Sequence, residues 1–169
     1  MPKEKISIKF ELEWKRPKNA NGEPFKWGDA KSTKIDESWS YCYLIYRWVR
    51  QSDGAIAYIG ETQNPLIQRV NRYQKAKTHG AGQGYANYKV YCEQKKLARK
   101  KDFLFIEYCN DPSEFFAGGL FNNPMLLMLF EVLLIKYYKP YLQSRPSGPP
   151  EFKTGIGSEF LPIEYDLIR

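Results

Sequence analysis

Glu131 is a charged residue in the middle of an otherwise apolar run. The run extends from Met125 to Ile135, and every other position in it is apolar. Its eleven residues, bounded by Pro124 and Lys136, predict a core helix, because a helix that crosses a bilayer needs roughly 20. An ionised carboxylate is costly to bury without a partner. We therefore expect Glu131 either to form a salt bridge with a nearby Lys or Arg or to be a functional carboxylate, and the run by itself does not decide.

Arg69 and Tyr73 form a second candidate group, four residues apart in a predicted helix. This spacing places both side chains on one helix face. The helix follows residues 60–64, Gly-Glu-Thr-Gln-Asn, where a glycine permits close backbone approach and a helix N-terminus favours an anion.

An arginine, tyrosines and one acid near each other would suit phosphate-ester cleavage. Arginine stabilises developing phosphoryl charge, an acid holds a divalent metal, and a phenol can relay a proton. Each residue also has an ordinary interpretation, as a core-edge tyrosine, a solvated arginine or a paired glutamate.

The elements that must position these residues begin with a hairpin. Residues 41–49 are rich in aromatic and branched side chains and predict a central strand. Ser52-Asp53-Gly54 is typical of a hairpin turn, and the return strand is expected at 55–60.

Helices and one more strand follow the hairpin. The first helix is expected to run to about Lys77, with Asn64 as its cap and Pro65 at its first position. The later elements are a helix at 85–101, a strand at 102–109 and the Glu131 helix, which ends near Tyr138. This order predicts a small α/β sheet with helices packed on it.

The ends of the chain differ from this core. Residues 6–14 alternate apolar and polar side chains, which predicts a half-buried strand within an N-terminal extension, 1–40. Residues 144–169 contain several prolines and glycines and are expected to form an extended tail. With the core at 41–143, the chain is expected to form a single structural domain.

Composition narrows the function classes. A content of 43% hydrophobic and 16% aromatic residues excludes general disorder. The net charge of +7 suits a polyanionic partner without requiring one. Three widely spaced cysteines form no zinc or disulfide pattern. The first five residues contain no apolar signal region, so we expect a cytoplasmic protein that contacts no membrane.

Three motifs in order resemble the GIY-YIG nuclease family. Leu44-Ile45-Tyr46, eleven further residues and Tyr58-Ile59-Gly60 resemble its two signature strands. Residues 64–73 resemble its first helix, with Arg69 as the catalytic arginine and Tyr73 one turn later. Residues 130–143 resemble its metal-binding helix, and the similarity covers roughly residues 41–143. The resemblance implies an α/β (α+β) fold with a small central three-stranded antiparallel sheet flanked by helices, here with an extra N-terminal strand.

The resemblance also implies a metal-dependent DNA endonuclease with one Mg²⁺ or Mn²⁺ ion in its active site. Glu131 would hold the ion as its only protein carboxylate, and Arg69 would bind the scissile phosphate. Tyr46 would help to remove a proton from the attacking water, which requires nearby positive charge because a tyrosine pKa is ordinarily near 10. Tyr58 would orient the nucleophile or phosphate, and Tyr73 would add a supporting hydrogen bond.

Three positions depart from the family pattern. Leu44 replaces the first glycine, and Tyr43 is an alternative to Tyr46 for the tyrosine role. Glu61 follows the second motif, where it could repel phosphate or pair with an arginine. Gln143 stands where an asparagine is usual.

Double-stranded DNA is the expected partner. Runs of charged residues are more often solvated faces than binding sites, but seven basic residues could neutralise DNA phosphates. These residues are Lys75, Lys77, Lys95, Lys96, Arg99, Lys100 and Lys101. A type II restriction endonuclease is the first hypothesis, and it implies a homodimer or paired monomers on DNA because one such centre cuts one strand. The alternatives are a repair or mobile-element nuclease that cuts one strand or branched DNA, and a catalytically silent nucleic-acid-binding module.

Overall fold

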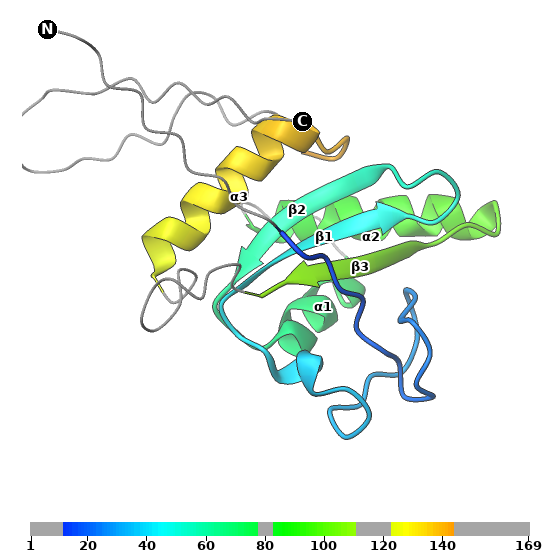
Figure 1. Cartoon of the computed structure of the whole chain (residues 1–169). Helices are drawn as coiled ribbons and strands as arrows, with labels where there is room; N and C mark the ends of the chain where they lie inside the picture. Colours follow the sequence, from blue (N-terminus) through cyan, green and yellow to red (C-terminus); the bar gives the residue numbers. More distant parts are fainter. Residues whose placement is uncertain (1–11, 78–82, 111–122, 144–169) are drawn as a thin grey trace, which may run out of the picture.

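Three antiparallel strands form the sheet, in the order β2-β1-β3. The computed structural model describes residues 12–77, 83–110 and 123–143. The strands are β1 (Leu44–Arg50), β2 (Ile56–Thr62) and β3 (Leu104–Cys109). Tyr46 of the central strand lies opposite Gly60 of β2 and Tyr108 of β3. The expected three-stranded antiparallel sheet is confirmed (Figure 1).

Helices cover both faces of the sheet. They are a short 3-10 helix, η1 (Glu37–Ser40), and the α-helices α1 (Leu66–Gln74), α2 (Gln83–Arg99) and α3 (Pro124–Tyr138). Residues of α1 and α2 pack in one buried cluster with Tyr46 and Trp48, whereas α3 packs in a second cluster with Ile45 and Ile59. Side chains alternate between the faces of a strand, so these clusters lie on opposite faces. The expected α/β (α+β) fold is confirmed. Within the described ranges, no helix is long and apolar enough to cross a membrane.

The Glu131 helix starts and stops as expected. The Asn123 side chain accepts a hydrogen bond from the N–H of Met125 at 2.9 Å, and Pro124 occupies the first turn, where its missing N–H has no partner to lose. The helix ends at Tyr138 because Lys139 adopts a left-handed conformation, with φ of 49°.

The expectation for α1 was wrong at both ends. Its N-cap is Pro65, whose ψ of 136° is not helical, and no side chain caps the helix. The N–H of Leu66 is instead bonded to the carbonyl of Tyr41 at 3.0 Å. A backbone carbonyl before β1 therefore accepts a hydrogen bond at the start of the helix, in place of the Asn64 side chain. The helix ends at Gln74 rather than near Lys77.

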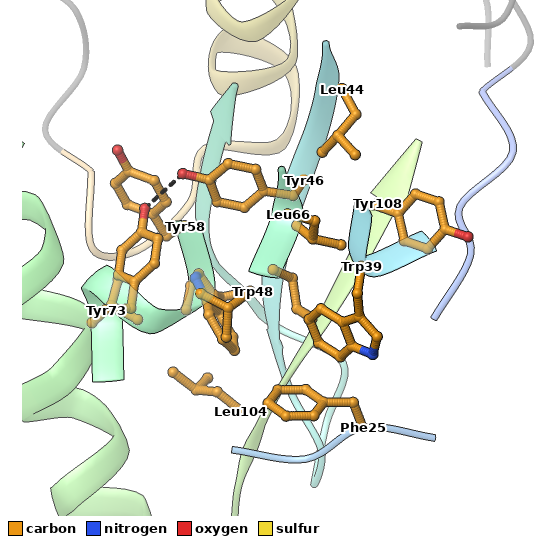
Figure 2. Close-up of a cluster of buried hydrophobic side chains, with 14 of the residues drawn as sticks. Phe25, Trp39, Leu44, Tyr46, Trp48, Tyr58, Leu66, Tyr73, Leu104 and Tyr108 are labelled. Atoms are coloured by element: carbon orange, nitrogen blue, oxygen red, sulfur yellow. Dashed lines mark hydrogen bonds between the residues drawn. The ribbon is translucent and has the colours of Figure 1, made fainter. Parts of the chain in front are cut away.

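Residues 15–40 are built onto the core. Phe25 and Trp39 are fully buried in the cluster that contains Tyr46 (Figure 2). Lys15 forms an antiparallel bridge with Tyr108 of β3, with both N–H···O distances 2.8 Å. Most of the strand expected at 6–14 lies outside the described residues, and residues 12–14 are not in a strand. The tail at 144–169 also lies outside the described residues.

The chain after α3 is fixed along the outer edge of β2. The N–H groups of Tyr141 and Leu142 donate to the carbonyls of Ile56 and Ala57, at 3.2 and 2.9 Å. The Gln143 side chain accepts from the N–H of Ile59 at 2.8 Å and donates to its carbonyl at 2.7 Å. This amide pairs with β2 as a neighbouring strand would, which gives Gln143 a structural role.

Replacement of Gln143 by alanine should lower the free energy of unfolding by about 1–3 kcal/mol, because both polar groups of a buried residue, Ile59, lose a partner. Urea denaturation measures this change. Gln51 is exposed, so Gln51→Ala serves as the matched control and should stay within about 0.5 kcal/mol of wild type. Equal stability of the two variants would contradict the structural role of Gln143.

Candidate active site

Three tyrosines and one arginine meet at one end of the sheet. Tyr46 comes from β1, Tyr58 from β2, and Arg69 and Tyr73 from α1. The Tyr46 and Tyr73 hydroxyls are 2.8 Å apart. Arg69 donates to the Tyr46 hydroxyl through Nε at 2.6 Å and to the Tyr73 hydroxyl through Nη2 at 3.3 Å. Figure 2 shows the Tyr46 and Tyr73 hydroxyls facing one another, with the Tyr58 ring beside them.

Gly60 makes this convergence possible. It lies opposite Tyr46 in the β1–β2 pairing. A Cβ atom at residue 60 would lie 2.6 Å from Cζ of Tyr46 and 3.0 Å from Cε1 of Tyr58, and closer still to the Tyr46 hydroxyl oxygen. Any other residue would therefore displace the Tyr46 ring from the position in which Arg69 bonds it.

The choice between Tyr43 and Tyr46 is clear in geometric terms. Tyr46 is fully buried within the cluster. Tyr43 precedes β1, has a left-handed φ of 52° and is 38% exposed. Only Tyr46 is placed to take part in the arginine–tyrosine cluster.

The tyrosines of the cluster are held neutral. Burial raises the pKa of Tyr46 above its ordinary value, and the charge of Arg69 offsets this only in part. Burial also raises the pKa of Tyr73, and burial followed by the Glu131 charge raises that of Tyr58. Burial would lower the pKa of Arg69, but the surrounding tyrosine oxygens raise it overall, so the guanidinium keeps its charge.

Glu131 is half-buried on α3, and its charge acts on Arg69 and Tyr58 of this cluster. Among the described residues it forms no salt bridge, so the expected pairing with a Lys or Arg at the helix edge is not seen there. Burial and then the Glu61 charge raise the pKa of Glu131 to about 7, against the opposing effects of Arg69 and of the Glu61 backbone N–H. Burial also raises the pKa of Glu61.

These groups fit a hard divalent cation. Oxygen donors are the ligands that Mg²⁺ and Mn²⁺ prefer, and Oε2 of Glu61 is buried without a hydrogen-bond partner among the described residues. No group of three acidic, His or Cys side chains suited to a metal occurs in those residues. A cation here would thus take most of its ligands from substrate phosphate and water.

The predicted DNA-binding residues divide into two groups. Lys75 and Lys77 are exposed directly after α1, close to Tyr73 in sequence. The second group is exposed at the C-terminal end of α2 and just beyond it: Lys95, Lys96, Arg99, Lys100 and Lys101. That end leads into Leu104, which pairs with Arg50, four residues or about 13 Å along β1 from Tyr46. The second group therefore lies towards the opposite end of the sheet from the tyrosine cluster.

Sequence reasoning expected Glu61 either to repel phosphate or to pair with an arginine, and it did not place this residue near Glu131. Among the described residues Glu61 forms no salt bridge. The signal that was present is its spacing from Ile59: residues two apart on a strand share a face, and Ile59 packs against α3.

An arginine–tyrosine cluster with a neighbouring carboxylate, mounted on a small antiparallel sheet, is chemically suited to phosphodiester cleavage. A family model described as the GIY-YIG catalytic domain matches residues 41–144. The chain belongs to the GIY-YIG family, which confirms the resemblance seen in its motifs. Membership supports an endonuclease function with DNA as substrate, in a family that generally depends on a divalent metal. No curated protein and no solved structure matches the chain.

Glu131 should make folding stability depend on pH in metal-free buffer. The folded state holds a proton on Glu131 up to a pKa of about 7, whereas the unfolded chain loses it near the ordinary value. Stability is therefore expected to fall as pH rises from about 4.5 to above 7, by about 3 kcal/mol for this residue. Urea denaturation across this range, compared with Glu131→Gln, isolates the effect. Parallel pH profiles for the two proteins would contradict it, and Mg²⁺ should restore stability to the wild type at pH 8.

Proposed function

We propose that this protein is a Mg²⁺- or Mn²⁺-dependent DNA endonuclease of the type II restriction class. The observation that carries the proposal is the hydrogen-bonded cluster of Arg69, Tyr46 and Tyr73 with the Glu131 carboxylate beside it. A partly buried positive charge near a carboxylate suits the charge that develops on a scissile phosphate.

Arg69 binds and orients the phosphate in this proposal. Two of its N–H groups bond the Tyr46 and Tyr73 hydroxyls, and a guanidinium has five donors, so others are left for phosphate oxygens. The two tyrosines hold the planar group in place, which reduces the entropy lost when substrate binds. Tyr58 lies next to this group and orients the phosphate or the attacking water.

Tyr46 acts as a proton relay rather than as a standing phenolate. Its pKa is raised by burial, so the hydroxyl is neutral at physiological pH. Arg69 donates to the Tyr46 oxygen, so the Tyr46 proton is free to point at Tyr73 or at a nucleophile. The hydroxyl can therefore take a proton from an attacking water only if, in the same step, it gives its own proton to the departing oxygen of the phosphodiester, directly or through Tyr73.

Glu131 would hold the cation in the site. When bound, the ion would neutralise phosphate charge and make a coordinated water more acidic. The raised pKa of Glu131 in the absence of metal means that metal and proton compete for the same carboxylate.

Restriction-type cleavage is supported by the way the N-terminal extension is attached. Phe25 and Trp39 are buried in the same cluster as Tyr46. Any base contacts made by residues 12–40 would therefore lie at a fixed distance from the phosphate that is cleaved. Since one centre cuts one strand, a double-strand break requires two copies on the duplex.

Glu131→Gln should reduce Mg²⁺-dependent cleavage of plasmid DNA by at least about 100-fold, because the amide keeps the shape and removes the charge that binds the ion. Gel analysis of a random-sequence plasmid pool gives the rate and the pattern together. Discrete double-strand fragments are expected. Nicks without sequence preference would favour a repair or mobile-element nuclease, and binding without cleavage would favour a silent module. Undiminished cleavage by Glu131→Gln would show that the assigned metal site is wrong.

The two basic groups can be tested through salt dependence. Lys75→Gln with Lys77→Gln should lower the slope of log affinity against log salt by about 2, because each phosphate contact contributes about 1. Lys100→Gln with Lys101→Gln should do the same on a duplex long enough to reach the end of α2. Filter binding in Ca²⁺ measures both pairs. An unchanged slope for either pair would remove that group from the DNA interface.

A further inference from the structure

Glu61 faces α3 from the end of β2. It lies two residues beyond Ile59 and opposite Ile45 of β1, and both of these isoleucines pack in the buried cluster formed with α3. Alternation along the strand therefore directs the Glu61 side chain to the same face. Glu131 follows Phe130, which belongs to that cluster. The two carboxylates are thus placed by two elements that pack together.

The Glu61 carboxylate has no adequate partner among the described residues. Its Oε2 atom is buried and forms no hydrogen bond there, and no salt bridge to Glu61 occurs in the same residues. The charge of Arg69 acts on both acids, but the Arg69 hydrogen bonds described go to the tyrosine hydroxyls of the cluster.

Two partly buried acids beside a single arginine leave negative charge uncompensated whenever both are ionised. Buried charges are normally paired or coordinate a metal. A divalent cation between the two carboxylates would supply the missing positive charge and would give the unpartnered Oε2 atom a ligand.

We propose that Glu61 is a second carboxylate of the cation site, which contributes an oxygen ligand beside Glu131 either directly or through a bound water. The inference rests on the metal site of the proposed function and changes its ligand set from one protein carboxylate to two. The Glu61 backbone keeps a separate role, since its N–H stabilises the ionised Glu131 side chain.

Mn²⁺ binding by the DNA-free full chain tests the proposal, with free Mn²⁺ followed by electron paramagnetic resonance. Glu61→Gln should weaken Mn²⁺ binding by about 10-fold or more, and so should Glu131→Gln. Glu23 is exposed, so Glu23→Gln is the matched control and should keep wild-type affinity.

A thermal unfolding scan in a metal chelator separates a ligand from a structural residue. Glu61→Gln should unfold at the same temperature as wild type or higher, because it removes one of two like charges, and Mn²⁺ should stabilise it less than wild type. Wild-type Mn²⁺ affinity in Glu61→Gln together with loss in Glu131→Gln would overturn the proposal and leave the endonuclease function intact. Absence of Mn²⁺ binding by the wild type would also overturn it. Failure of the function itself would instead appear as lack of plasmid cleavage by the wild type.

Discussion

The bonding of the Arg69 guanidinium to two tyrosine hydroxyls is the interaction on which the site depends. It joins the central strand to α1 through Tyr46 and Tyr73, and it is made where a glycine in β2 leaves room for the Tyr46 ring. A buried charge is tolerated only when its donors are satisfied. The same bonds therefore hold the helix on the sheet and fix the direction in which the remaining guanidinium donors point.

The carboxylate side of the site is organised by the outer strand. β2 packs against α3 through Ile59, and the chain that leaves α3 returns to bond the edge of β2 through Leu142 and Gln143. These contacts set how far Glu131 lies from the arginine. A sheet strand that is held on one face by tyrosines and on its edge by an amide is a rigid support for the proposed catalytic groups, and rigid support is what positioning requires.

Electrostatic interactions couple the arginine–tyrosine cluster to the two carboxylates. Burial disfavours every charged group in the site, and only Arg69 keeps its charge regardless of the surroundings. The pKa values of both acids rise in response, that of Glu131 to about 7. In the proposed reaction a substrate phosphate would add negative charge to this site, and a divalent cation would bring the total charge back towards balance.

Local sequence signals determined the elements and their order. Three signals act within a few residues and can therefore be read from the sequence alone. They are the Ser52-Asp53-Gly54 turn, the Asn123-Pro124 start of α3 and the apolar run around Glu131. The spacing between Tyr46 and Tyr58 also favoured Tyr46 over Tyr43, and Tyr46 is the one that lies in the cluster. The expectation that Asn64 caps α1 was wrong, because the first N–H of the helix is bonded to the carbonyl of Tyr41, more than twenty residues away in the chain.

The tertiary structure decided which side chains meet. Glu61 and Glu131 are seventy residues apart in the sequence, and only the packing of α3 on β2 reveals that their charges interact. The two bonds between Gln143 and Ile59 likewise depend on where the chain returns after α3. Pattern and propensity describe a residue and its near neighbours, whereas burial and Coulomb interaction depend on distances in space, which are set only when the elements pack.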